Sequence, residues 1–270
     1  MIVREIECKS VLQDTGLPAD HVINCYVGCG HACCYCYARY MKRFTGHKEP
    51  WGTFVDVRVN APAVLEREVR RKQPGSVMLS SVCDGWQPLE KKHRVSGTCA
   101  AILVEHGWPV RILTKSALVR CDLDVLADAE DADIGVTLTA ADEEVRRAIE
   151  PGASPTEERV RLLEEAAERG IGVWAFLGPF LPGLTDTEEN INALMGRIAH
   201  LPLTHLHADR LNFRSGVAAS VRETVTRRFP SLGEAYARLG RDAALDRAYE
   251  EELGALTRAL AGKHGLSGLL

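Results

Sequence analysis

Six short runs of β-forming residues alternate with longer segments of helical periodicity, and this alternation constrains the fold more than any other feature. The runs lie at 21–27, 76–82, 110–115, 133–139, 171–177 and 203–208. Strands that alternate with helices predict parallel pairing through right-handed crossovers. The length of 270 residues fits either one α/β barrel or two smaller domains. Asn60 and Asp186 are predicted to cap the helices that follow them.

The two faces of the predicted strands differ in polarity. One face of 133–139 carries branched apolar residues, and the other carries Gly135, Thr137 and Thr139. An apolar outer face with a small or polar inner face suits an open barrel with a wet lumen, because a closed eight-stranded barrel fills its interior with branched side chains. We predict an α/β fold, a partial (β/α)6 TIM-type barrel over residues 1–210, with a helical C-terminal extension over 211–270 packed on it.

Five of the nine cysteines fall between residues 25 and 36. The charged N-terminus does not resemble a secretory signal, and no apolar run approaches the ~18 residues of a membrane span. We therefore expect a cytoplasmic protein that does not enter a membrane. Cytosolic thiols are kept reduced, so a cluster of cysteines there more often holds a metal than forms disulfides.

The cysteine cluster contains Cys29, Cys33 and Cys36 in C-x3-C-x2-C spacing directly after the first predicted strand. Gly28 and Gly30 let the backbone bend close to the sulfurs. A structural zinc site needs four ligands, usually from two separate halves, and no second half follows in the chain. Three ligands suit a 4Fe–4S cluster with one iron free for a substrate or cofactor. The alternative is a zinc site whose fourth ligand is Cys25, Cys34 or His31.

This spacing resembles the radical S-adenosylmethionine superfamily, whose hallmark is such a motif in the loop after the first barrel strand. Five segments in order resemble its spore-photoproduct-lyase-like group and span roughly residues 22–210: NCYVGCGHACCYCYAR, SSVCDGWQPLEKKHR, VRILTKSALV, IEPGASPTEERV and GPFLPGLTD. The resemblance implies a partial barrel and a site-differentiated 4Fe–4S cluster ligated by Cys29, Cys33 and Cys36. It also implies reductive cleavage of S-adenosylmethionine to a 5′-deoxyadenosyl radical, which abstracts hydrogen from a substrate.

The resemblance further assigns contacts with S-adenosylmethionine to residues at the ends of the predicted strands. The residues so assigned are Tyr35, Gly178 and Pro179 for the adenine, Ser80 and Ser81 for the amino group, Lys115 for the carboxylate, and Thr137 and Thr139 for the ribose. The assignment of Lys115 is also supported by the residues alone, since a lysine on the inner face of an apolar strand needs an anionic partner. The alternative is that its long side chain extends to the rim of the barrel and places the ammonium in solvent.

Cys83 is a candidate catalytic residue. It lies just past the second predicted strand, beside Asp84, where a side chain can face the radical. Spore photoproduct lyase has a hydrogen-donating cysteine in this region, although alignment on Asp84 places its match nearer Ser81. The alternative is a buried structural thiol. Glu150 is expected to anchor its loop, and the alternative is that it faces the site. The lumen-facing His205 and His207 either bind substrate or satisfy each other.

The sequence leaves the substrate open between a nucleic-acid lesion and another nucleic acid or metabolite. The net charge of −4 gives no overall attraction for phosphate. Segment 217–261 has only Tyr236 and Tyr249 where spore photoproduct lyases are tyrosine-rich. The expected partners are S-adenosylmethionine and an external electron donor such as flavodoxin or ferredoxin. The alternative from another class is a non-enzymatic metal-binding protein with a structural or redox-sensing role.

Overall fold

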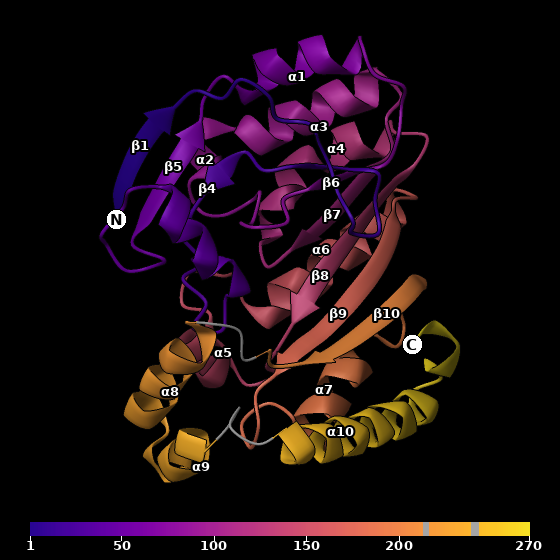
Figure 1. Cartoon of the computed structure of the whole chain (residues 1–270). Helices are drawn as coiled ribbons and strands as arrows, with labels where there is room; N and C mark the ends of the chain where they lie inside the picture. The colour runs from indigo at the N-terminus through magenta and orange to yellow at the C-terminus, as the bar shows by residue number, and fades with distance from the viewer. Residues whose placement is uncertain (213–215, 239–242) are drawn as a thin grey trace.

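The computed structural model describes residues 1–212, 216–238 and 243–270 (Figure 1). Within these ranges the main sheet has seven strands in the order β10-β9-β8-β7-β6-β3-β2. They are β2 (Gln13–Asp14), β3 (His21–Ile23), β6 (Val77–Leu79), β7 (Val110–Thr114), β8 (Ala132–Leu138), β9 (Gly172–Phe180) and β10 (Leu203–Arg210). From β3 onward each strand pairs in parallel with the next, and β2 is an antiparallel edge strand. The alternation thus correctly predicts an α/β fold with a parallel sheet.

The prediction of one continuous strand over residues 21–27 is wrong. It breaks after β3, and β4 (Tyr26–Val27) joins a second sheet of order β1-β5-β4 with β1 (Ile2–Ile6) and β5 (Phe54–Arg58). Arg58 explains the break: its backbone N–H donates to the Cys25 carbonyl at 3.0 Å. Its guanidinium donates to the Asn24 carbonyl at 2.9 Å. The chain is therefore drawn away from the main sheet just before the cysteine loop.

Helices connect the strands, and some of them pack on the main sheet (Figure 1). They are α1 (Ala61–Val69), α2 (Glu90–His93), α3 (Val95–Glu105), α4 (Leu123–Ala127), α5 (Glu143–Ile149), α6 (Thr156–Glu168) and α7 (Glu188–Ile198), with the 3-10 helices η1 (Tyr37–Phe44) and η2 (Ala117–Asp122). Helix α6 packs on β8 and β9. Ile134, Val136 and Leu138 of β8 are fully buried in this core, and burial of such a side chain stabilises the fold by roughly 1.5–3 kcal/mol.

Asn60 occupies the predicted N-cap position of α1 but makes no side-chain cap hydrogen bond, and the predicted cap Asp186 is wrong. The Asn60 side chain does not cap α1; it accepts from the Cys8 N–H at 2.8 Å and donates to the Cys8 carbonyl at 3.0 Å. At α7 the cap is Thr187, whose hydroxyl accepts from the Asn190 N–H at 3.2 Å. Asp186 instead accepts from Tyr249 of the C-terminal segment at 2.9 Å. In both cases the side chain that the local pattern assigned to the helix end hydrogen-bonds a residue far away in the sequence.

After β10 the described chain is helical. It comprises α8 (Val217–Arg228), η3 (Pro230–Leu232), α9 (Gly233–Arg238), α10 (Ala243–Lys263) and η4 (Ser267–Leu269). Helix α8 packs on α5, and α10 packs on α7 and β10. Of the predicted extension, residues 213–215 and 239–242 lie outside the described residues. None of the described helices combines the length and apolarity that crossing a membrane requires.

Candidate functional site

The cysteine loop, residues 28–36, follows β4 and is held in place by three other parts of the chain. Gln87 is fully buried and clamps the start of the loop: its Oε1 accepts from the Gly30 N–H at 2.7 Å, and its Nε2 donates to the Gly28 carbonyl at 3.3 Å. These two bonds lie on either side of Cys29. The backbone of the first cysteine is therefore fixed by a residue 58 positions later in the chain.

Segment 149–153 holds the middle of the cysteine loop. The Cys34 N–H donates to the Ile149 carbonyl at 2.9 Å, and the Gly152 N–H donates to the His31 carbonyl at 3.0 Å. A Cβ at Gly152 would lie only 2.1 Å from the Gly30 carbonyl oxygen, so only glycine permits this approach of two backbones. Gly152 of IEPGAS thus has a packing role at the site.

Arg39 holds the end of the loop. Its guanidinium donates to the carbonyls of Cys36, Cys33 and Cys34 at 3.1, 3.2 and 3.0 Å. Three carbonyls that would otherwise need water or other donors are thus satisfied by one fork-shaped side chain. Gln87, Gly152 and Arg39 lie within or beside the resemblance segments, but the sequence analysis gave none of them a role.

The three thiols of the motif belong to one mostly buried loop. Cys29 and Cys33 are each 7% exposed, and Cys36 is half-buried. Burial raises the pKa of the Cys29 thiol, and the neighbouring Asp84, Cys33 and Cys36 raise it further. Among the described residues, no three His, Cys, Asp or Glu side chains meet closely enough to hold a metal ion. As a donor set, three adjacent cysteines in a constrained loop fit an iron–sulfur cluster, whose usual protein ligands are cysteine thiolates.

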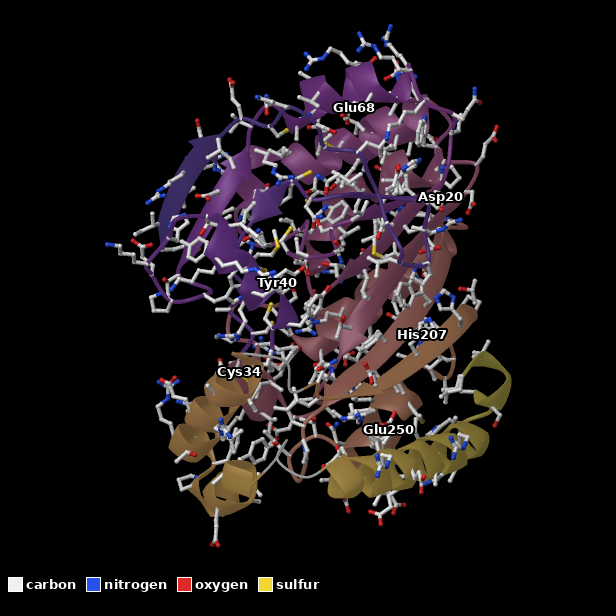
Figure 2. The ribbon with its side chains drawn as sticks, viewed as in Figure 1. Asp20, Cys34, Tyr40, Glu68, His207 and Glu250 are labelled. Carbon is white, nitrogen blue, oxygen red and sulfur yellow. The ribbon has the colours of Figure 1, made fainter. Side chains whose placement is uncertain are left out.

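The three residues considered as a fourth zinc ligand have other neighbours. The thiols of Cys25 and Cys99 lie 3.8 Å apart in the core. Cys34 lies in an apolar cluster with Val217 and Val221 of α8, and Figure 2 shows it beside this helix. His31 is buried, with its Nδ1 3.4 Å from Asp84 Oδ2.

Asp84 connects this loop to the end of β7. One of its carboxylate oxygens accepts from the Thr114 hydroxyl at 2.7 Å, and the other accepts from the Lys115 N–H at 2.8 Å. Burial lowers the pKa of the neighbouring His31 and outweighs the opposing effect of Asp84. The His31 ring is therefore neutral at pH 7, and Asp84 fixes the strand end from which Lys115 projects.

Lys115 is a half-buried cation beside the cysteine loop. Its Nζ lies 5.8 Å from the centre of the Tyr35 ring. Within the part of the chain that the structure describes, this ammonium group makes no hydrogen bond or ion pair. Burial disfavours its charged form, but Cys33, Glu150 and Asp84 outweigh burial and raise the pKa of its ammonium group. Lys115 thus stays charged and can take an anionic partner.

Glu150 is the centre of a buried polar network that joins several predicted site residues. It is fully buried and pairs with Arg159, which is also fully buried. Its other oxygen accepts from the Tyr35 hydroxyl and from the Thr139 hydroxyl. The Thr139 hydroxyl oxygen also lies 2.6 Å from the Gly178 carbonyl oxygen. Tyr35, Thr139 and Gly178, which the resemblance assigns to the adenine and ribose, are therefore brought together.

The charge of Glu150 is set by two opposing effects. Burial would raise the pKa of its carboxyl group, but the charges of Arg159 and Lys115 and the hydrogen bonds from Arg159 and Tyr35 lower it to about 2. Glu150 is therefore ionised at pH 7. Its place in the network agrees with the expectation that it anchors its loop.

Ser80, Ser81 and Cys83 gather around Asn24, just past the end of β6. Oδ1 of Asn24 accepts from the Ser81 N–H at 3.0 Å, and its Nδ2 donates to the Ser81 hydroxyl at 3.3 Å. The Cys83 thiol is 3.5 Å from the Ser80 hydroxyl and 3.8 Å from Asn24 Oδ1. Burial raises the pKa of Cys83 to about 12 despite the Ser80 hydrogen bond. Its thiol is therefore protonated at pH 7 and carries a hydrogen.

The remaining predicted residues lie farther along the sheet. Thr137 is buried, and its carbonyl accepts from Arg159 at 2.7 Å. Gly178 and Pro179 lie inside β9 rather than in a turn, because β9 extends to Phe180. His205 and His207 of β10 contact each other, with ring centres 5.1 Å apart, and both contact Trp174.

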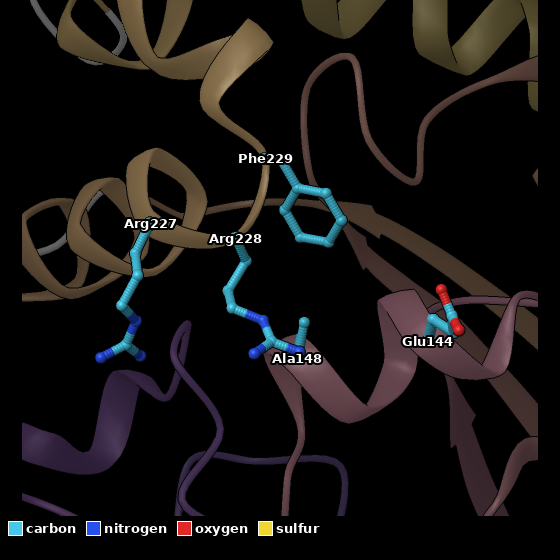
Figure 3. A pocket seen from close by; sticks show the side chains of 5 residues that line it. All are labelled: Glu144, Ala148, Arg227, Arg228 and Phe229. Atoms are coloured by element: carbon cyan, nitrogen blue, oxygen red, sulfur yellow. The ribbon is translucent and has the colours of Figure 1, made fainter.

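A surface pocket of about 260 Å³ lies apart from these residues (Figure 3). It is lined by Glu144, Ala148, Arg227, Arg228 and Phe229, from α5 and the end of α8. None of the predicted site residues lines it.

Comparison with known proteins relates both the sequence and the fold to other chains. A family model described as the radical SAM superfamily matches residues 23–195. An uncharacterized protein of Mycobacterium tuberculosis is 30% identical over 276 residues, which cover 98% of this chain and 81% of that protein. An uncharacterized protein of Methanocaldococcus jannaschii is 32% identical over 185 residues, 68% of this chain and 70% of that protein.

Two solved structures share the fold at low sequence identity. One is a spore photoproduct lyase variant with bound AdoMet and dinucleoside spore photoproduct, with a TM-score of 0.70 and 15% identity over 98% of this chain and 79% of that chain. The other is Streptococcus suis SuiB bound to S-adenosylmethionine, with a TM-score of 0.53 and 14% identity over 85% of this chain and 49% of that chain.

Proposed function

The chain belongs to the radical SAM superfamily, and from this premise we propose that it is an enzyme whose Cys29, Cys33 and Cys36 ligate a site-differentiated 4Fe–4S cluster. When bound, the cluster supplies the electron that cleaves S-adenosylmethionine to a 5′-deoxyadenosyl radical. The chain's own residues hold the three thiols in place through Gln87 and Arg39. The alternative of a purely structural or redox-sensing metal protein does not agree with membership of this enzyme superfamily.

The observation that carries the proposal is the state of Lys115. Its ammonium is charged, half-buried and next to Cys33, and it has no ion-pair partner among the residues that the structure describes. A buried charge without a partner is expensive, so such a group is usually matched by a ligand of opposite charge. The carboxylate of S-adenosylmethionine is that ligand in our proposal.

The other proposed contacts with S-adenosylmethionine come from the residues around Asn24 and around Glu150. Ser80 and Ser81, braced by Asn24, would accept hydrogen bonds from the amino group of S-adenosylmethionine. Thr137 and Thr139 would contact the ribose, and Gly178 and Pro179 would line the adenine. Tyr35 is fixed by Glu150, and its ring lies below the Lys115 ammonium, so it would separate the adenine from the carboxylate end.

We propose Cys83 as the residue that exchanges hydrogen with the substrate. Its protonated thiol lies beside Ser80, and a sulfur–hydrogen bond is a source of hydrogen for a carbon radical. Transfer of solvent deuterium from this thiol into the product is the measurement that tests the role. The substrate stays open between a nucleic-acid lesion and a small metabolite.

The domain division belongs to the same proposal. Residues 1–210 would form a partial (β/α)6 barrel core, because six parallel strands follow one another in the described sheet. Residues 211–270 would form an extension that closes over the cysteine loop, because Val217 and Val221 of α8 share a cluster with Cys33 and Cys34.

Anaerobic reconstitution with iron and sulfide tests the proposed function. We expect a protein that binds about four irons and forms 5′-deoxyadenosine from S-adenosylmethionine when dithionite is supplied, because the radical SAM fold and its three thiols are present. Chromatography of the nucleoside product is the measurement. Iron-loaded protein that leaves S-adenosylmethionine intact under these conditions would contradict the proposal.

Lys115→Met should weaken binding of S-adenosylmethionine about thirtyfold, because truncating one partner of a desolvated charge pair costs about 2 kcal/mol. Equilibrium dialysis of anaerobic, cluster-loaded protein measures this dissociation constant. The matched control is Arg111→Met. Arg111 points to the same side as Lys115 but lies at the opposite end of β7, where it pairs with Asp131. The control should keep its affinity within about twofold; equal affinity in the two variants would disprove the role of Lys115.

A further inference from the structure

The helix η1 carries an exposed basic and aromatic face directly after the last cysteine of the motif. Residues 37–48 contain four basic side chains, Arg39, Lys42, Arg43 and Lys48, and no carboxylate. This local excess stands against a whole-chain charge of −4. Tyr40 and Phe44 are 38% and 67% exposed. Large exposed aromatic side chains next to positive charge are typical of protein interaction surfaces.

The inner face of η1 explains why these aromatic residues cannot simply turn inward. Ala38 is buried, and Met41 packs with Trp51 and Phe54 in a small apolar cluster under the helix. That space is already filled, so Tyr40 and Phe44 remain outside. The Arg43 guanidinium lies 5.6 Å from the centre of the Tyr40 ring and 4.6 Å from that of Phe44.

The same face adjoins the most accessible of the three proposed cluster ligands. Cys29 and Cys33 are buried, whereas Cys36 is half-buried. Helix η1 begins at the next residue, Tyr37. Arg39 ties the helix to the loop through the Cys33, Cys34 and Cys36 carbonyls. A partner seated on η1 would therefore be beside Cys36, the most accessible of the three proposed ligands.

We propose that Tyr40, Lys42, Arg43, Phe44 and Lys48, here called the η1 face, form the docking surface for a small redox protein with an acidic face. The inference rests on the proposed function, because the partner delivers one electron to the cluster while being oxidised by one electron, with no bond made or broken. Positive charge here would attract an acidic donor, and Tyr, Phe and Arg are residues that concentrate binding energy at interfaces.

Charge reversal tests the docking surface with a purified acidic flavodoxin as probe. The variant Arg43→Glu/Lys48→Glu changes two side chains whose charged ends make no hydrogen bond among the described residues. Calorimetry at low salt should show flavodoxin binding weakened at least about tenfold. Its salt dependence should also become flatter, since fewer charge pairs remain to be screened. The neutral variant Arg43→Gln/Lys48→Gln should fall between the charge-reversed and wild-type proteins.

The matched control reverses two exposed arginines on or just after α1, Arg67→Glu/Arg71→Glu, with the same change in net charge. It should bind flavodoxin as the wild type does. Formation of 5′-deoxyadenosine driven by flavodoxin should fall in the η1 variant, whereas formation driven by dithionite should not, because the small reductant needs no docking surface.

Three results would overturn the docking surface. They are unchanged flavodoxin binding in the η1 variant, equal weakening in the α1 control, and weakened binding of single-stranded DNA with flavodoxin binding intact. Failure of the proposed function looks different, because the wild type would then form no 5′-deoxyadenosine even with dithionite.

Discussion

Cys33→Ala is expected to abolish both iron binding and formation of 5′-deoxyadenosine. The variant keeps only two thiols of the motif, and two thiolates do not hold a site that needs three. Cys33 is also the motif thiol whose surroundings include both Glu150 and Lys115, so its loss removes the anchor nearest the proposed cofactor site. Iron analysis, visible absorbance under anaerobic conditions and the nucleoside assay measure the two losses together.

The chain provides a matched control one residue away. Cys34→Ala removes a thiol of the same size and similar burial from the apolar cluster that also contains Cys33. Cys34 lies outside the C-x3-C-x2-C spacing of the three proposed ligands. Cys34→Ala should keep its iron and activity. Loss of iron in Cys34→Ala with retention in Cys33→Ala would reverse the ligand assignment.

Glu150→Gln is expected to lower the free energy of unfolding by about 3–5 kcal/mol at pH 7. The substitution keeps the shape of the side chain but leaves the fully buried Arg159 without its counter-charge, and an unpaired buried charge costs that much. Tyr35 and Thr139 also lose a charged acceptor. Urea denaturation of the protein without added cofactor measures the difference.

The control for this prediction lies on the same helix as Arg159. Glu158→Gln weakens an ion pair between Glu158 and Arg120 that is partly exposed, and Arg120 keeps its second partner, Glu165. Exposed pairs contribute about 0–1 kcal/mol, so this variant should be close to the wild type. Equal stability of Glu150→Gln and Glu158→Gln would show that the buried network is not needed for folding.

The destabilisation caused by Glu150→Gln should depend on pH, and the lowered pKa of the Glu150 carboxyl group fixes the direction of this dependence. The folded-state pKa of Glu150 is about 2, below the value of about 4.3 expected in the unfolded chain. Its stabilising contribution is therefore fully present above about pH 4.3 and is lost as the pH falls toward 2, by about 3 kcal/mol in total. The difference between the wild type and Glu150→Gln should shrink over this interval.

Much of the fold could be predicted because hydrophobic periodicity is local. The face of β8 that carries Ile134, Val136 and Leu138 is buried as the alternation predicts. The break at Asn24 was missed, since it depends on Arg58, which follows in a strand that the sequence analysis did not recognise. Local patterns report which face of a strand is apolar, but they do not report which other segment competes for its backbone.

The candidate site divides in the same way. The spacing of Cys29, Cys33 and Cys36 predicts a metal centre in one loop, because three thiols within eight residues can serve one centre wherever the loop is placed, and the family resemblance predicts its chemistry. Tertiary structure alone decided what surrounds them: the clamp by Gln87 and the close approach of Gly152. It also joined Tyr35 to Glu150, 115 residues later in the chain. Burial and charge pairing are properties of the packed site, so neither the cationic state of Lys115 nor the ionised Glu150 can be read from the neighbours of either residue in the sequence.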